Sequence, residues 1–146
     1  MTVAEMKKRA CEAVDKNHDK ILAVAESIFA EPELGYKEFK TAKKFTDFLD
    51  KLGVKYTDKV GITGVVAPFK GKESKLRVAV MGELDAVVVP NHKFADPVTH
   101  AAHCCGHNSQ ASSVVGVAYA LKESGIMDEL DGDMMVGHEE ADLDGL

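Results

Sequence analysis

The segment Leu76–Met81 constrains the fold of this chain more than any other. It is short, rich in β-branched residues and almost entirely apolar, a pattern typical of a strand that is covered on both faces. We therefore predict that it lies at the centre of a sheet. The residues after it, from Gly82 to Thr99, form a long loop with little periodicity, and such a loop inside a compact domain is more often functional than idle.

Amphipathic helices are predicted on both sides of this strand. Apolar residues recur at helical spacing in three segments, namely Ala4–Ala30, Lys37–Leu52 and Ser109–Ser124. Pro32 ends the first helix, because proline restricts the residue before it and donates no hydrogen bond. Gly53 ends the second, and Asn108 or Ser109 is the expected N-cap of the third.

Further strands complete a sheet of mixed direction. A β region begins at Val54–Tyr56, a strand follows a tight turn at Gly61–Ala67, Phe69–Ser74 is expected to be a hairpin loop, and Met134–Val136 is a short last strand. This order of helices and strands predicts an α/β fold of three layers, with a mixed sheet covered by helices. At 146 residues the chain is expected to form a single domain, residues 1–146.

Composition excludes several classes of function. A net charge of −6 without a basic cluster argues against a nucleic-acid partner. No apolar run reaches the roughly 18 residues of a membrane span, and the first residues lack the apolar core of a signal peptide. Three cysteines, two of them adjacent, make a poor disulfide framework. We expect a cytoplasmic protein.

The segment His100–Asn108 concentrates metal-binding side chains just before the third helix. It holds three of the six histidines and two of the three cysteines, and imidazole and thiolate are ligands for first-row metals. Cys105 and His107 can point at one ion because Gly106 lets the backbone bend between them. The alternative from these residues alone is a buried cysteine pair beside surface histidines.

Two acidic motifs accompany this segment. Glu83 and Asp85 follow the apolar strand, and sites in α/β sheets form beyond the carboxyl ends of strands. Residues two apart on an extended segment face the same side, although such a sequence also occurs in plain turns. Glu139 and Glu140 follow the last strand, where one carboxylate can bind a metal while the other takes a proton from water. Their alternative is a solvated acidic tail.

Taken together, these motifs resemble a known family of enzymes. The series, in chain order, is Phe29–Gly35 with Glu38, Gly61–Gly64, Gly82–Ala86, Ala95–Pro97 and His103–Asn108. It is similar to the N-terminal half of the catalytic domain of zinc-type amidohydrolases and peptidases related to aminoacylase and glutamate carboxypeptidase. Within that family it looks most like the branch of aminobenzoyl-glutamate hydrolases and amino-acid amidohydrolases.

The resemblance implies a fold, a site and a reaction. The fold is that of a two-zinc exopeptidase, and the cofactor is zinc or manganese in a two-metal site. Cys105, His107 and Glu140 correspond to metal ligands, Asp85 to the carboxylate that supports a ligand, and Glu139 to the general base. The implied reaction is hydrolysis of the amide of an N-acyl amino acid, an aminobenzoyl-glutamate-like compound or a small dipeptide.

The sequence also departs from the family pattern. The Glu pair follows Val136-Gly137-His138 where relatives have Pro-Ala, so His138 is a competing ligand. Further histidine ligands and the lid domain through which relatives dimerise have no counterpart, and we expect a truncated enzyme that is inactive alone. The alternative is a catalytically silent folded fragment that self-associates through an exposed sheet edge. Either way we expect a homo-oligomer and a small-molecule amide as the substrate of the family.

Overall fold

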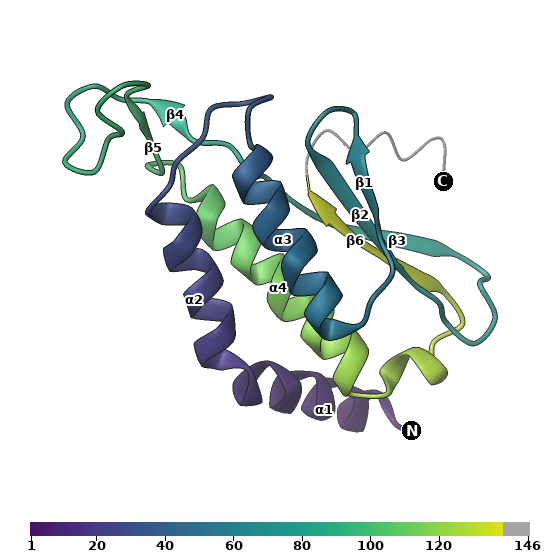
Figure 1. Ribbon diagram of the computed structural model, residues 1–146. Coiled ribbons are helices and arrows are strands. Elements are labelled where there is room, and N and C mark those ends of the chain that lie inside the picture. The colour runs from purple at the N-terminus through teal and green to yellow at the C-terminus, as the bar shows by residue number, and fades with distance from the viewer. Residues whose placement is uncertain (139–146) are drawn as a thin grey trace.

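The computed structural model describes residues 1–138, and Figure 1 shows its helices and strands along the chain. Helices α1 (Val3–Lys16) and α2 (His18–Phe29) replace the single helix expected over Ala4–Ala30, and they meet at Asn17. The buried Asn17 amide donates to the Ala13 carbonyl and to Glu123 of another helix. These hydrogen bonds satisfy the polar groups of the break, so the chain changes direction without leaving them unpaired.

Helix α3 (Phe39–Leu52) confirms the second predicted helix and its end. Gly53 takes a left-handed conformation with φ of 67°, which glycine adopts without steric cost. At the other end the Glu33 carboxylate accepts hydrogen bonds from the backbone N–H groups of Lys40 and Thr41. Glu33 therefore caps the helix although it lies several residues before it in the sequence, and these hydrogen bonds hold the intervening loop against the helix.

The main sheet is mixed and has four strands in the order β1-β2-β6-β3. Its strands are β1 (Thr57–Val60), β2 (Gly64–Phe69), β3 (Arg77–Gly82) and β6 (Asp133–His138). β6 runs antiparallel to β2 and parallel to β3. A smaller pair, β4 (Val87–Val88) and β5 (Ala101–Ala102), lies within the long loop. The predicted α/β class with a mixed sheet and helical cover is confirmed.

Two local expectations were wrong, because β6 inserts between β2 and β3. The strand predicted to be central, Leu76–Met81, is β3 at an edge of the described sheet. Phe69–Ser74 connects strands that are not neighbours, so it is no hairpin loop. The strand predicted over Met134–Val136 is confirmed as β6, which is longer and runs from Asp133 to His138. The order of the strands in a sheet depends on pairing between segments that are far apart in the sequence, and local sequence patterns carry no information about that pairing.

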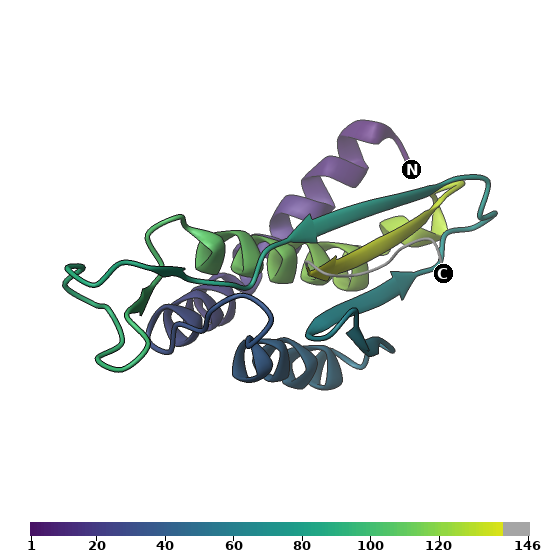
Figure 2. The same cartoon turned by 90° about the horizontal axis from the view of Figure 1, so that it is seen from above.

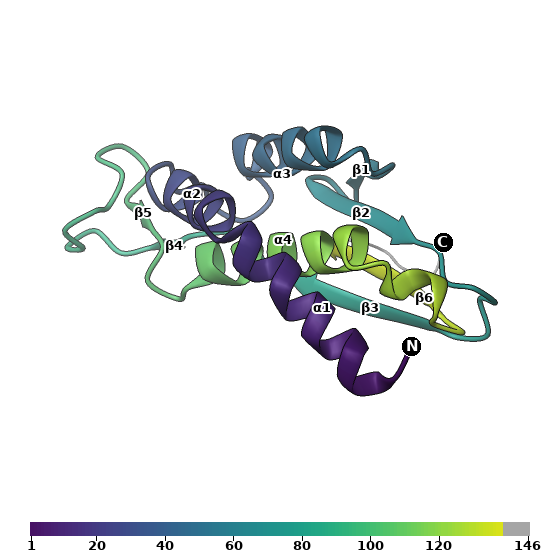
Figure 3. The same ribbon diagram turned by 90° about the horizontal axis from the view of Figure 1, so that it is seen from below.

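Helices α3 and α4 (His107–Glu123) pack against the sheet, and α1 and α2 pack against α4 (Figures 2 and 3). The core lies between α3, α4 and the sheet, where Phe45, Leu49, Val65, Val115 and Val136 are almost fully buried. A short 3-10 turn (Ile126–Asp128) leads from α4 towards β6. No helix within residues 1–138 is long and apolar enough to cross a membrane.

Candidate metal centre

The candidate site forms where β3 ends and α4 begins. Gly82 closes β3, and a Cβ at this position would lie 2.9 Å from Val114 Cγ2 of α4. Only glycine therefore lets the helix pack this closely over the end of the strand. The Glu83 backbone N–H donates to Gln110 Oε1 of the same helix at 3.2 Å. These contacts place the first residue of α4 beside the two carboxylates that follow β3.

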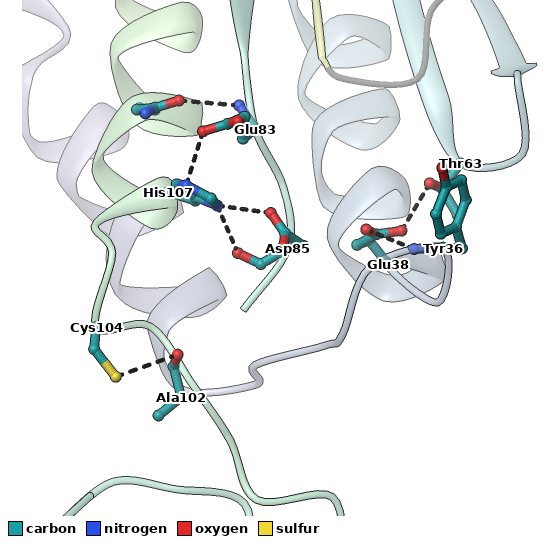
Figure 4. A network of polar contacts seen from close by, with 9 residues as sticks. Tyr36, Glu38, Thr63, Glu83, Asp85, Ala102, Cys104 and His107 are labelled. Atoms are coloured by element: carbon teal, nitrogen blue, oxygen red, sulfur yellow. Dashed lines mark hydrogen bonds and ion pairs between the residues drawn. The ribbon is translucent and has the colours of Figure 1, made fainter. Parts of the chain in front are cut away.

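His107 lies between those two carboxylates (Figure 4). Its Nδ1 is 2.6 Å from Asp85 Oδ1, and its Nε2 is 2.7 Å from Glu83 Oε2. Carboxylates only accept hydrogen bonds, so both ring nitrogens carry a proton in this arrangement. The structure thus brings together Glu83, Asp85 and His107 as an imidazolium held between two carboxylates.

Electrostatics favour this charged state of His107. Burial by itself lowers the pKa of the imidazole, but the hydrogen bond to Asp85 and the charges of Asp85 and Glu83 outweigh it, so the pKa is raised. The His107 side chain is 10% exposed, whereas the Glu83 side chain is 46% exposed. Positive charge is therefore stabilised at a spot that solvent reaches from the Glu83 side.

The start of α4 differs from the expectation. The helix begins at His107, and its N-cap is Gly106 in a left-handed conformation with φ of 94°. Asn108 and Ser109 are therefore inside the helix, and the predicted caps were wrong. The ion pairs of His107 with Glu83 and Asp85 supply a tertiary reason for starting the helix earlier, and Gly106 accommodates the turn without strain.

The cysteines do not join this cluster. Cys105 is exposed and makes no hydrogen bond within residues 1–138. Cys104 is also exposed, and its Sγ lies 3.6 Å from the Ala102 carbonyl oxygen (Figure 4). Glu139 and Glu140, predicted as general base and ligand, lie outside the described residues. Within residues 1–138 no group of three or more His, Cys, Asp or Glu side chains is arranged to hold a metal ion.

Two buried histidines were not included among the predicted ligands. Among residues 1–138, neither ring nitrogen of His103 or His138 has a hydrogen-bond partner. Burial and the nearby His107 lower the pKa of His103. Burial lowers the pKa of His138 to about 3, and a contact with the Gly82 backbone opposes this shift only in part. The spacing of two residues between His103 and Cys105 could have indicated His103 as a further candidate ligand. His138 was predicted only as a competing ligand.

A buried glutamate supports the loop beside Asp85. Glu38 is 2% exposed and accepts hydrogen bonds from the Tyr36 backbone N–H and the Thr63 hydroxyl (Figure 4). The Glu33 carbonyl accepts from the Ala86 N–H at 2.6 Å, which joins the same loop to the residue after Asp85. The sequence analysis included Glu38 among the family motifs but predicted no role for it. A charged residue within such a motif could have indicated one.

The residues present fit a divalent metal by their chemistry. A histidine whose Nδ1–H is held by a carboxylate presents Nε2 as a ligand, the usual arrangement behind metal-binding histidines. In the structure Asp85 holds Nδ1, and Nε2 faces the exposed Glu83 where a positive charge is already stabilised. His107 is thus oriented as a ligand would be, while the remaining donors are not gathered around it.

Known proteins with similar sequences are amidohydrolases and peptidases. Thermostable carboxypeptidase 1 of Saccharolobus solfataricus is 32% identical over 131 residues, which cover 87% of this chain and 33% of that protein. IAA-amino acid hydrolase ILR1-like 5 of Arabidopsis thaliana is 32% identical over 132 residues, covering 87% of this chain and 29% of that protein. No family model matches the chain.

A solved structure agrees with these sequences. The YxeP protein of Bacillus subtilis, described as a dinuclear metal binding peptidase from the M20 family, superposes with a TM-score of 0.72 at 27% identity. The match covers 85% of this chain and 35% of that one. Fold and sequence therefore agree that the known proteins similar to this chain are amidohydrolases and peptidases.

Over most of its length the chain is thus similar to amidohydrolases and peptidases of the M20 family. The resemblance found in the sequence is therefore confirmed at the level of the family. The chain spans about a third of the length of the curated relatives it matches.

Proposed function

We propose that this chain supplies part of the metal centre of an M20 amidohydrolase that uses zinc or manganese. Its substrate would carry an amide bond to an amino acid: an N-acyl amino acid, an aminobenzoyl-glutamate-like compound or a small dipeptide. The names of the relatives, a carboxypeptidase and an IAA-amino acid hydrolase, support this substrate class. The observation that carries the proposal is the His107 ring held by Asp85 through Nδ1.

The proposed roles follow the family motifs of the sequence, and the contact between His107 and Asp85 supports the roles of these two residues. His107 and Cys105 are metal ligands, and Asp85 fixes the tautomer and orientation of His107. Glu140 is a further ligand, and Glu139 takes a proton from the attacking water. When bound, a divalent metal supplies Lewis-acid polarisation of the amide carbonyl and acidifies water.

Cobalt binding tests the ligand assignment. Co²⁺ bound to a cysteine thiolate gives a near-ultraviolet absorption band, and thiolate and imidazole are both good ligands for this ion. We expect the band on titration of the full chain with Co²⁺, and we expect Cys105→Ser to abolish it. Cys104→Ser is the matched control and should retain it. A band that depends on Cys104 instead, or no band with the unaltered chain, would refute the assignment of Cys105.

Activity is a separate measurement. We expect no turnover of N-acetyl or aminobenzoyl amino acids by this chain alone with added zinc or manganese. The reason is that an ion held by few ligands is not fixed in the rigid, open geometry that hydrolysis needs. Metal-dependent turnover that disappears in both Cys105→Ala and Glu139→Gln would show that the chain builds a working site by itself.

A further inference from the structure

A pocket of about 420 Å³ lies between helices α2, α3 and α4, which pack against one another (Figure 1). All of its lining residues belong to these three helices, and it shares no residue with the candidate metal centre. Its volume is within the range of pockets that hold small organic molecules. The pocket is therefore large enough for a ligand of its own.

The inner surface of this helical pocket is largely apolar and aromatic. Phe48 of α3 and Tyr119 of α4 line it, and they are only 7% and 8% exposed. Their rings meet edge to face with centroids 5.1 Å apart. Ala23 and Val24 of α2 complete the apolar part of the lining. Such a surface favours the ring or hydrocarbon part of a ligand over water.

Two lysines add positive charge to the pocket. Lys20 comes from α2 and Lys51 from α3, and both are exposed. The Lys20 ammonium donates to the Asn17 side-chain oxygen at 2.9 Å. An ammonium group has three donors, so Lys20 keeps two for a ligand, and its partner is a neutral amide. Among residues 1–138 neither Lys20 nor Lys51 forms an ion pair with a carboxylate.

The other charged residues of the lining are already balanced. Lys44 contacts the Glu31 carboxylate at 2.6 Å. Asp47, the one carboxylate among the described lining residues, is paired with Lys43 on the same helix. These two pairs cancel in charge, so the surplus charge at the pocket is that of Lys20 and Lys51. A pocket with a positive surplus favours a negatively charged ligand.

Tyr119 also brings a hydroxyl group to this pocket. Within residues 1–138 this hydroxyl has no hydrogen-bond partner, although the residue is almost fully buried. Burial raises the pKa of Tyr119, so the hydroxyl is protonated at neutral pH and can donate. The Lys20 ammonium lies 5.5 Å from the centroid of the same ring. Buried hydroxyl groups usually have a partner, and an acceptor oxygen of a ligand would supply one here.

We propose that this pocket binds a small organic anion that has an aromatic body and a carboxylate group. The ring lies against Phe48 and Val24, and the carboxylate accepts hydrogen bonds from Lys20, Lys51 and the Tyr119 hydroxyl. Hydrogen bonds from charged donors to a carboxylate are the strong ones. The proposal is independent of the proposed hydrolysis, because it uses neither a metal nor a residue of the candidate metal centre.

A second pocket is the main competitor for such a ligand. It measures about 480 Å³, lies between α1, α2 and α4, and is also lined mostly by apolar residues. Asp15 is the one charged residue among the described residues that line it. It therefore suits an uncharged or cationic ligand, and variants of Lys20 and Lys51 distinguish the two pockets.

Isothermal titration calorimetry of the metal-free full chain with naphthoate tests the proposal. We expect saturable binding with a dissociation constant below about 1 mM, which a ligand of this size can reach. Naphthamide, which keeps the ring but has no charge, should bind at least about tenfold more weakly. Acetate, which has the charge without the ring, should not bind measurably. Added salt should weaken the binding of naphthoate and leave that of naphthamide unchanged.

Three variants locate the binding site. Lys20→Gln, Lys51→Gln and Tyr119→Phe should each weaken naphthoate binding at least about threefold, because each removes one donor to the carboxylate. Lys7→Gln, on an exposed lysine of α1 outside the pocket, is the matched control and should leave binding unchanged. Circular dichroism of each variant shows whether it is folded. If Tyr119→Phe does not fold, the two exposed lysines decide.

Three results would overturn the proposal. Absence of saturable naphthoate binding would mean that the pocket holds no such anion. Equal affinity for naphthoate and naphthamide would reduce the pocket to an apolar surface without selectivity for charge. Undiminished naphthoate binding in both Lys20→Gln and Lys51→Gln would place the ligand elsewhere on the chain.

Discussion

The two ends of the parallel strands β3 and β6 differ in how completely their polar groups are hydrogen-bonded. At the amino end, Asp133 opens β6 and is 2% exposed. Its carboxylate accepts hydrogen bonds from the Lys70 ammonium, the Gly71 backbone N–H and the Ser74 hydroxyl, at 2.7 to 3.0 Å. The segment between β2 and β3 is thereby fastened to β6, and each of these polar groups has a partner.

At the carboxyl end the polar groups are incompletely satisfied. His138 closes β6, and within residues 1–138 both of its buried ring nitrogens lack hydrogen-bond partners, as do those of His103. Glu83 and Asp85 converge on His107, and Cys105, two residues earlier in the chain, is exposed. Buried polar groups without partners reduce stability, and natural proteins retain them mainly at functional sites.

The amino end of this strand pair therefore contributes to stability, and the carboxyl end carries the candidate functional groups. In α/β sheets ligands bind beyond the carboxyl ends of the strands, and that is the end where this chain leaves its donors and acceptors available. Substitutions at the amino end should therefore change the stability of the fold, and substitutions at the carboxyl end should change metal binding. The predictions below test this division.

Replacing His107 with alanine should have the largest effect. We expect His107→Ala to abolish Zn²⁺ and Co²⁺ binding, because it removes the buried imidazole that Asp85 orients. The melting temperature of the metal-free chain should also fall, because the two ion pairs that hold the start of α4 are lost. Isothermal titration calorimetry and thermal unfolding measure the two effects, with the exposed His18→Ala as the control. Undiminished metal binding would exclude His107 as a ligand.

Replacing Asp85 with asparagine should weaken metal binding without abolishing it. The amide keeps the shape and an acceptor for Nδ1–H but loses the negative charge that raises the basicity of His107. Changes to such supporting groups lower metal affinity by about 10–100-fold. Competition with a chelating dye measures the affinity, and Asp58→Asn on β1 is a matched control. Equal affinity for Asp85→Asn and the unaltered chain would remove Asp85 from its supporting role.

Much of this arrangement could be predicted from local sequence. The periodicity of Lys37–Leu52 and the glycine after it gave α3 and its left-handed end. The apolar run at Leu76–Met81 gave β3, and the acidic residues after it were placed correctly beyond a strand end. Each of these features depends on residues close together in the chain, where spacing and conformational preference act directly.

Features that depend on distant residues were missed. The position of β3 at an edge follows from the insertion of β6, which lies more than fifty residues later in the sequence. The start of α4 at His107 follows from its contacts with Glu83 and Asp85, which override the capping preference of Asn108. The burial of Asp133 and His138 likewise requires the packed sheet, and the apolar pattern of β6 did not indicate it.

At the amino end we expect Asp133→Asn to lower the melting temperature by several degrees. The Lys70 ammonium would lose its charged partner, and the loop from Gly71 to Ser74 would lose part of its attachment to β6. Asp131→Asn is the matched control, because Asp131 is 57% exposed and its contact with Lys75 is 3.4 Å, so its effect should be small. Similar losses for both variants would argue against a special role of Asp133.

The difference in stability between the unaltered chain and Asp133→Asn should depend on pH. The hydrogen bonds from Lys70, Ser74 and Gly71 hold the pKa of Asp133 far below its ordinary value of 3.8. A carboxyl group whose pKa is lowered in the folded state stabilises that state above its ordinary pKa, and this stabilisation is lost as the pH falls further. The difference in melting temperature between the unaltered chain and Asp133→Asn should thus be full at neutral pH and should shrink below about pH 4. A difference that grows in acid would contradict this origin.

The smallest effect, and the one of opposite sign, is expected for His138→Leu at the carboxyl end. The imidazole is fully buried and lies edge-on to the Phe45 ring at a centroid distance of 3.9 Å, and it has no hydrogen-bond partner in the part of the chain that the structure describes. Leaving a buried polar group unsatisfied costs about 1–3 kcal/mol, and an apolar side chain of similar size avoids that cost. After allowance for the lost ring contact, we expect urea unfolding to show a gain of about 1 kcal/mol. A loss of stability instead would mean that the His138 nitrogens find partners in solution. A gain would mean that the chain keeps an unfavourable imidazole at this position, as expected of a group retained for a function at this end of the sheet.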